Sequence, residues 1–229
     1  MRLQKYMSQS GIASRREAER WIQSGWVRLN GEVVLELGTQ MDPEVDVLTV
    51  VKPDSEPQFE RQIIVFHKPV GIVTNCPQGD ETEIADLLPP EYQRFNAIGR
   101  LDKASEGLIL LTNDGLVSQR LLDPKFPHER VYEVSLDYAL PEKTRDELES
   151  GVYLFGERTK PLKIKYLASD VVEMRMHEGK NRQIRRMMQK VGIGVLKLKR
   201  LSFGPIHLGN LEVGGMRLLS NPEMADLLG

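Results

Sequence analysis

The sequence predicts an α+β protein in two parts: a small helical unit with a β-hairpin, then a large mixed, mainly antiparallel sheet domain. The first observation is that helical spacing and one tight-turn signal occupy the first fifty residues. The second is a charged segment at 52–57 that contains two prolines, a composition typical of a linker. The third is that strand-like and helix-like segments follow without the strict β-α-β order of a parallel sheet.

Length and composition are those of an ordinary globular protein. The chain has 229 residues, of which 40% are hydrophobic and 28% charged, which excludes collagen, coiled coils and wholesale disorder. No apolar run approaches the roughly 18 residues that span a bilayer, and the first residues lack the apolar core of a secretion signal. The single Cys76 cannot form an internal disulfide. We therefore expect a cytoplasmic, reduced protein with no membrane partner.

The charge is distributed unevenly along the chain. The net charge is −2, which by itself indicates no particular partner. Residues 1–30 contain six Arg or Lys and two acids, whereas residues 175–200 contain nine Arg or Lys and one acid. Two basic regions on an otherwise acidic chain favour an anionic partner; two solvated basic faces are the alternative.

The first fifty residues contain clear local signals. Leu3, Tyr6 and Met7 have helical spacing. Ser14 and Glu17 have the pattern of a capping box at the start of a second helix, and Asn30-Gly31 between two apolar triplets predicts a hairpin. The apolar stripe of the second helix leaves basic side chains on the outside, namely Arg15, Arg16 and Arg20, near the turn that contains Arg28.

The remainder of the chain predicts a mixed sheet with several helices. We expect strands at 63–66, 72–74, 108–111, 131–136, 164–167, 171–176 and 195–201. Helices are expected near 81–88, 115–122, 142–150 and 182–191.

One candidate catalytic group is Asp102, in the glycine-bracketed segment 99–107 that precedes an apolar strand. Such a turn holds a carboxylate rigidly at the floor of a cleft, and the flanking Arg100 and Lys103 favour its ionised form. Taken alone, a solvent-exposed loop aspartate is the stronger interpretation.

A second candidate is the basic helix near 182–191. Its apolar side chains form one stripe, which leaves Arg182, Arg185 and Arg186 on the other faces. Arg182 and Arg185 are three residues apart, so both side chains can point to one side. Their guanidinium groups suit phosphates or a carboxylate; an exposed basic helix end is the alternative.

A third candidate is Tyr132, which strand alternation places on the same face as Arg130. A tyrosine there can stack on a nucleobase, although core tyrosines are commoner on strands. The four histidines are scattered and have no ligand-like spacing, so we expect no metal.

Two resemblances join these observations. Residues 1–50, with Ser14-Arg15-Arg16-Glu17-Ala18 and Gly25-Trp26-Val27, resemble the RNA-binding domain of the fourth protein of the small ribosomal subunit. Nearly the whole chain resembles the RsuA-type family of ribosomal RNA pseudouridine synthases. Two long strings carry this resemblance: Gly99-Arg100-Leu101-Asp102 with Ser105-Glu106-Gly107-Leu108, and Glu178-Gly179-Lys180-Asn181-Arg182-Gln183-Ile184-Arg185-Arg186-Met187.

The second resemblance implies an isomerase with a catalytic cleft across the middle of a large mixed sheet and no metal or organic cofactor. It implies that Asp102 is the catalytic aspartate, that Tyr132 contacts the base, and that Arg185 pairs with Asp102. The substrate would be ribosomal RNA or an assembling ribosomal subunit, with the large subunit slightly favoured, and we expect a monomer. The expected RNA-binding side chains are Arg15, Arg16, Arg20, Arg28, Arg100, Arg182 and Arg186.

The expected organisation is an RNA-binding domain at 1–52, a linker at 53–60 and a catalytic domain at 61–229. Two rival functions remain open at this point. One is a non-catalytic RNA-binding or ribosome-assembly factor with the same fold. The other is a nucleic-acid enzyme of another class, which would need metal ligands that the sequence does not offer.

Overall fold

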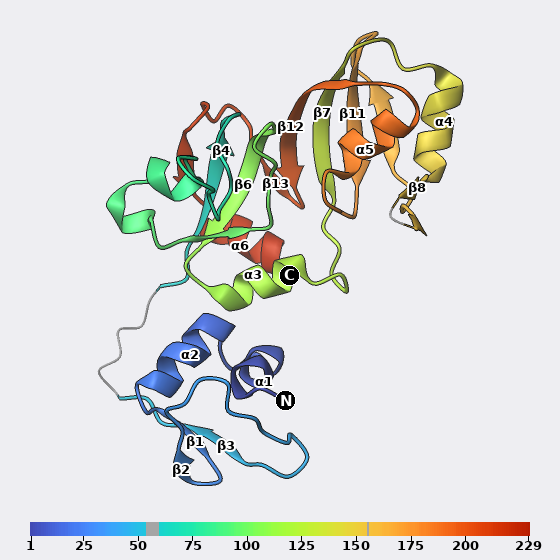
Figure 1. The fold of residues 1–229 in the computed structure, drawn as a ribbon. Coiled ribbons are helices and arrows are strands. Elements are labelled where there is room, and N and C mark those ends of the chain that lie inside the picture. Colours follow the sequence, from blue (N-terminus) through green and yellow to red (C-terminus); the bar gives the residue numbers. More distant parts are fainter. Residues whose placement is uncertain (54–59, 155) are drawn as a thin grey trace.

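The computed structural model describes residues 1–53, 60–154 and 156–229. The N-terminal unit consists of α1 (Leu3–Gln9), α2 (Arg15–Gln23) and a three-stranded antiparallel sheet in the order β2-β1-β3 (Figure 1). The strands are β1 (Val27–Leu29), β2 (Glu32–Val33) and β3 (Leu48–Val50). They enclose a small core of their own, made of Leu3, Met7, Ala13, Ala18, Trp21, Ile22, Val27 and Met41.

The local signals of this unit are confirmed. Ser14 caps α2 by accepting from the Glu17 amide, and the Glu17 side chain accepts from the Ser14 amide. Asn30 and Gly31 both have positive φ, 53° and 86°, as a tight type I′ turn requires. Strand β3 was not predicted, because it pairs with β1 only after a long excursion of the chain.

The second part is a nine-stranded sheet in which most neighbouring strands are antiparallel. The order is β10-β11-β7-β12-β6-β4-β14, with β13 paired to β12 and β5 paired to β6. Its strands are β4 (Ile63–Lys68), β5 (Asn96–Ile98), β6 (Glu106–Thr112), β7 (Arg130–Leu136), β10 (Lys163–Tyr166), β11 (Val171–Met176), β12 (Val195–Phe203), β13 (Ile206–His207) and β14 (Met216–Leu218). The predicted α+β class, with a large mixed and mainly antiparallel sheet, is confirmed.

Two halves of this sheet meet at a short parallel joint between β12 and β6. Only two residue pairs form it, Lys199 with Glu106 and Arg200 with Gly107. Gly107 has a φ of 114°, and a Cβ at this position would lie 2.3 Å from the Arg200 carbonyl oxygen. Glycine is therefore required for the two backbones to approach this closely.

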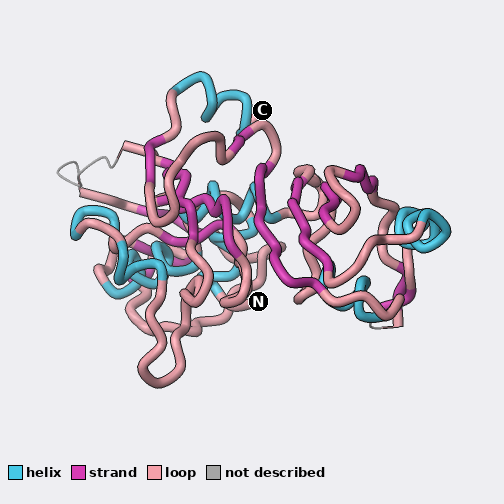
Figure 2. The backbone as a smooth tube through the Cα atoms, turned by 90° about the horizontal axis from the view of Figure 1, so that it is seen from above, coloured by secondary structure: helices cyan, strands magenta, loops and turns pink. Residues whose placement is uncertain are grey.

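Helices cover both faces of the sheet. Buried side chains of α4 (Glu142–Ser150) and α5 (Gln183–Lys190) belong to one core, and those of α3 (Gly115–Leu122) and α6 (Asn221–Leu228) to the other. Figure 2 shows the strands as two groups, with α4 at the far end of one of them. Two 3₁₀ turns, Ile84–Leu87 and Pro90–Tyr92, and a small hairpin of β8 (Tyr153–Leu154) and β9 (Glu157–Arg158) complete the described elements.

Two local predictions need correction. The strand expected at 72–74 is absent, and only Val73 forms an isolated bridge, to Glu83. The backbone of Val73 bonds to Thr82 and Ile84, at the start of the following 3₁₀ turn, and not to a neighbouring strand. The helix expected near 81–88 is a single 3₁₀ turn, which ends before the two prolines at 89–90. The predicted linker at 53–60 lies largely outside the described residues.

The N-terminal unit contacts the second part beside α3 (Figure 1). The Ser8 hydroxyl donates to Gln119 Oε1 at 2.8 Å, and Arg16 donates to Asn96 Oδ1 at 2.6 Å. Gly115 begins α3 against Ser14, where a Cβ would lie 2.3 Å from the serine Cβ. The N-terminal unit, which contains the basic region 1–30, therefore packs against the part of the chain that contains the basic region 175–200.

Candidate active site

A cavity of about 600 Å³ opens at the joint between the two sheet halves. Its size lies within the range of small-ligand pockets. The charges that line it are strongly unbalanced: six Arg or Lys side chains face one carboxylate, Asp102. The six are Arg100, Lys103, Arg130, Lys180, Arg182 and Arg200. The lining therefore suits an anionic ligand.

Backbone and hydroxyl bonds hold the loop that contains Asp102. The Thr74 hydroxyl donates to the Leu101 carbonyl at 2.8 Å and accepts from the Leu101 amide at 3.0 Å. The Gly71 amide donates to the Lys103 carbonyl at 2.8 Å, and the Ser105 amide donates to the Asp102 carbonyl at 2.9 Å. Asp102 is half-buried at the floor of the cavity, so the exposed-loop interpretation does not describe it.

Lys68, the last residue of β4, also holds the loop that contains Asp102. Its side chain is fully buried, and its Nζ donates to the carbonyl oxygens of Pro69 and Ser105, both at 2.9 Å. Burial lowers the pKa of Lys68 to about 8, against the raising effect of the Asp102 and Glu106 charges. The available signal was a lysine two residues after the apolar run 63–66, since a central strand buries both its faces.

Among the described residues, Asp102 forms an ion pair with Arg182, whereas the resemblance implied Arg185 as its partner. Arg182 Nη1 lies 3.6 Å from Asp102 Oδ2. Arg182 occupies the N-cap of α5 with a φ of 50°, a left-handed conformation that is uncommon outside glycine. The spacing in the sequence does not distinguish Arg182 from Arg185. In the structure, Arg182 at the N-cap of α5 is the one whose side chain reaches the loop that contains Asp102.

Arg185 instead cross-links the backbone around the site. Its Nη1 donates to the Val195 carbonyl at 3.0 Å and its Nη2 to the Ala104 carbonyl at 2.7 Å. Burial and the nearby Arg182 lower the pKa of Arg185, and the charge of Asp102 opposes this. In this structure both outer nitrogens of the Arg185 guanidinium therefore donate to backbone carbonyls.

The opposite wall of the cavity comes from β7 and β12. Tyr132 lies on it with 8% of its surface exposed, and Arg200 of β12 pairs directly across from Tyr132. Arg130 and Phe203 form the next part of the same wall. Sequence reasoning used Arg130 only to place Tyr132 and did not find Arg200, because the pairing of β7 with β12 joins distant residues.

The chemical inventory of the site is a single carboxylate, a tyrosine and several cations. In the described part of the chain, no cluster of three His, Cys, Asp or Glu side chains is arranged to hold a metal ion. No helix among the described residues is long and apolar enough to cross a membrane. One carboxylate beside cations is sufficient for nucleophilic or acid–base chemistry on an anionic substrate.

Comparison with known proteins decides the family. The model of the RNA pseudouridylate synthase family matches residues 62–190, and the S4 domain model matches residues 1–47. The chain belongs to the RNA pseudouridylate synthase family. The synthase is 38% identical to the dual-specificity RNA pseudouridine synthase RluF of Escherichia coli K12, over 99% of this chain and 78% of that protein.

Two further relatives cover nearly the whole synthase. The ribosomal large subunit pseudouridine synthase B of Bacillus subtilis is 35% identical over 99% of this chain and 95% of that protein. A crystal structure of a pseudouridylate synthase superposes with a TM-score of 0.73 at 30% identity and covers 99% of both chains. The predicted family, fold class and isomerase class are confirmed.

The remaining arginines that were expected to bind RNA lie at different places on the synthase. Arg15, Arg20 and Arg28 are exposed on the N-terminal unit. Arg16 is also exposed, but it donates to Asn96 and so contributes to the contact between the two parts. Arg100 and Arg182 line the cavity, and Arg186 donates to Asn181 at 3.3 Å on the basic helix.

Proposed function

We propose that this synthase converts a specific uridine of ribosomal RNA into pseudouridine, with Asp102 as the catalytic group. The observation that carries the proposal is the cavity at the sheet joint, where Asp102 is the one carboxylate among six cations. An RNA strand is the anionic substrate that the family implies, and the carboxylate is the one lining group suited to attack or to remove a proton.

The reaction needs no external group. The bond between C1′ of the ribose and N1 of uracil breaks, the base turns, and C1′ joins C5. The hydrogen on C5 leaves as a proton and N1 gains one, so the reaction is an isomerisation without redox change. The Asp102 carboxylate has two routes, attack on C1′ or removal of a sugar proton, and in both its negative charge is required. The positively charged Arg182 guanidinium lies 3.6 Å from this carboxylate.

Tyr132 and the N-terminal arginines have supporting roles in this proposal. A uridine must leave its stack to enter the cavity, which costs a few kcal/mol, and the Tyr132 ring on the cavity wall offers replacement stacking. Arg15, Arg20 and Arg28 then hold the flanking backbone through its phosphates. Residues 1–52 would serve as the RNA-binding domain and 61–229 as the catalytic domain.

For the substrate we propose large-subunit RNA. Support comes from the Bacillus subtilis relative, whose name specifies the large ribosomal subunit. Release of tritium from C5-labelled uridine tests both parts of the proposal, because forming the new bond expels the hydrogen at C5. We expect release from large-subunit RNA and none from small-subunit RNA, offered free or in particles.

The decisive variant is Asp102→Asn, which keeps the side-chain volume and removes the charge. We expect it to abolish tritium release and leave RNA affinity and melting temperature unchanged. Asp226→Asn, an exposed position on α6, is the matched control and should react at the parent rate. RNA binding without tritium release by the parent protein would favour the rival function, a non-catalytic assembly factor. Full activity of Asp102→Asn would refute the catalytic assignment.

A further inference from the structure

Two arginines on the wall opposite Asp102, the buried Arg200 and the half-buried Arg130, are not used by the proposed chemistry. Arg200 has 3% of its surface exposed, and its Nε donates to the Leu108 carbonyl at 2.6 Å. Its Nη2 is buried and has no hydrogen-bond partner among the described residues. A buried guanidinium nitrogen without an acceptor costs free energy. Arg200 Nη2 is therefore available to donate a hydrogen bond to a ligand in the cavity.

Arg130 adds a second cation at the same place. Its guanidinium lies 4.9 Å from the centre of the Phe203 ring, and that of Arg200 lies 5.9 Å from the same centre. Burial and the positive charge of Arg200 lower the pKa of Arg130. Within the described residues, neither arginine forms an ion pair with a carboxylate; Arg130 Nη1 donates only to the His128 carbonyl, at 3.2 Å.

A third polar group without a partner lies on the Asp102 loop, at the other side of the joint. Ser105, 1% exposed, lines the cavity, and its hydroxyl oxygen has no hydrogen-bond partner in the described structure. Ser105 lies two residues before Gly107, the residue that pairs with Arg200 across the sheet joint. A hydroxyl donor and two guanidinium groups without a carboxylate partner are a combination that suits a tetrahedral oxyanion.

We propose that Arg130 and Arg200, with the Ser105 hydroxyl, form a phosphate-binding subsite that holds a phosphate of the target nucleotide. The inference rests on the proposed function and adds to it the group by which the nucleotide is anchored. Because Arg200 is paired with Tyr132 in the sheet, a phosphate held here fixes the ribose next to the tyrosine. The ribose of the same nucleotide then lies near Asp102, which is three residues before Ser105 in the same loop.

Calorimetric titration of the full-length protein with small nucleotides tests this directly. The probes are uridine, uridine 5′-monophosphate, uridine 3′-monophosphate and inorganic phosphate. We expect one of the two monophosphates to bind at least tenfold more tightly than uridine, which identifies the phosphate on the 5′ or the 3′ side. Arg130→Met and Arg200→Met should remove this advantage and leave the affinity for uridine unchanged.

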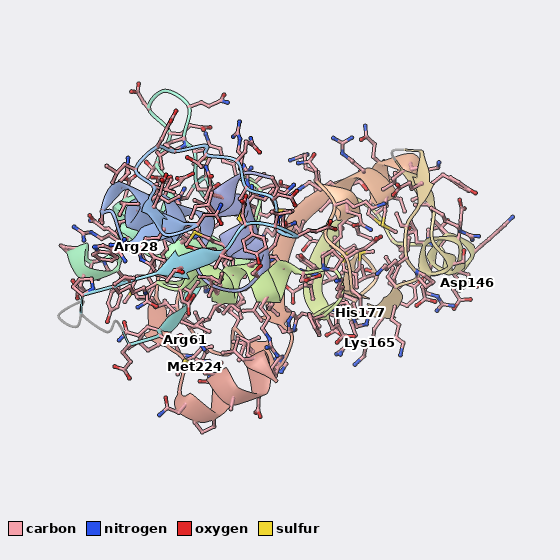
Figure 3. The ribbon with its side chains drawn as sticks, turned by 90° about the horizontal axis from the view of Figure 1, so that it is seen from below. Arg28, Arg61, Asp146, Lys165, His177 and Met224 are labelled. Atoms are coloured by element: carbon pink, nitrogen blue, oxygen red, sulfur yellow. The ribbon has the colours of Figure 1, made fainter. Side chains whose placement is uncertain are left out.

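The matched control is Arg145→Met. Arg145 lies on α4 beside Asp146, which Figure 3 shows at the end of the molecule away from Arg28 and the N-terminal unit. This variant should bind every probe like the parent protein. If Arg200→Met does not fold, Arg130→Met and the milder Arg200→Lys carry the test, since lysine keeps the charge and loses the fork.

Two results would overturn the subsite. One is equal affinity of the parent protein for uridine and for both monophosphates. The other is equal loss of uridine and nucleotide binding in the variants, which indicates a structural role. The titrations need no turnover, so they separate the two proposals. Tight monophosphate binding without tritium release would contradict the proposed function alone, whereas tritium release without the phosphate advantage would contradict the subsite alone.

Discussion

Replacing Lys68 by methionine separates the stability of the synthase from its activity. Methionine has a similar length and fills the buried site without a charge. The substitution removes the two hydrogen bonds that Nζ donates to the Pro69 and Ser105 carbonyls. The loop that contains Asp102 is then held less firmly. We expect the single-turnover rate of tritium release at pH 7 to fall by about tenfold, which corresponds to the free energy of about one charge-assisted hydrogen bond.

The magnitude of the stability effect follows from the depressed pKa. Burial lowers the pKa of Lys68 from 10.5 to about 8, so the folded state disfavours the charged form. Below pH 8 both states are protonated and this penalty is fully present. As pH rises from 8 toward 10.5 the folded protein releases the proton first, and the free energy of unfolding increases. Between pH 7 and 9.5 this increase amounts to about 2 kcal/mol.

Paired urea denaturation of the parent protein and Lys68→Met at several pH values measures the effect. The other titrating groups are common to both proteins, so the difference between their unfolding free energies isolates Lys68. We expect the parent to gain about 2 kcal/mol relative to the variant between pH 7 and 9.5. The single-turnover rate of the parent protein should fall above pH 8. In Lys68→Met this fall with pH should be absent. A difference in stability that stays constant with pH would refute the reasoning.

Further variants test the cations and the N-terminal unit. Arg185→Lys should slow single turnover by about tenfold with little change in RNA affinity, because one ammonium cannot bond both carbonyls held by Arg185. Arg182→Lys should react near the parent rate, since a point charge suffices at 3.6 Å. Equal rates for the two variants would contradict these roles. Deleting residues 1–52 should leave the rest folded and reduce the slope of log affinity against log salt by about one for each phosphate that is no longer bound. An unchanged slope would mean that the N-terminal unit does not bind RNA.

Most secondary structure could be predicted because its signals are local. The helix at 115–122 matches its prediction, since Asp114 caps α3 through its own side chain. The apolar run at 63–66 is the centre of β4, all of whose residues are buried. The short strands β5, β13 and β14 were missed. Each has two or three residues and depends on pairing with a distant strand, so a period of two cannot be recognised in it.

For the candidate site, the sequence predicted which residues take part, but not all of the contacts that they make. Asp102, Tyr132 and the basic helix do meet at one cavity. The resemblance implied Arg185 as the partner of Asp102, whereas the structure places Arg182, at the left-handed N-cap of α5, 3.6 Å from that carboxylate. The support by Lys68 and the wall position of Arg200 follow from burial and from strand register. These are long-range properties, and no spacing within the sequence encodes them.

The position of the cavity depends on the contacts that join the two halves of the sheet. The parallel joint of β12 and β6 has two residue pairs, so strand pairing alone fixes the halves weakly. Two arginines reinforce the joint: Arg200 of β12 donates to Leu108 of β6, and Arg185 of α5 donates to Ala104 before β6. Hydrophobic packing would serve the same end, but it would not add the positive charge that Arg200 brings to the cavity.

An arginine used in this way has two functions at once. One nitrogen bonds a carbonyl across the joint, while the positive charge remains in the cavity. The loop with Asp102 comes from one half of the sheet, and Tyr132 with Arg200 from the other. The guanidinium bonds at the joint therefore contribute to the spacing between the carboxylate and the tyrosine, while the charge of Arg200 adds to the positive lining of the cavity. We expect a substitution at Arg200 to change this spacing and the charge of the cavity together, whereas a substitution at Arg130, which makes no bond across the joint in the described structure, should change the charge alone.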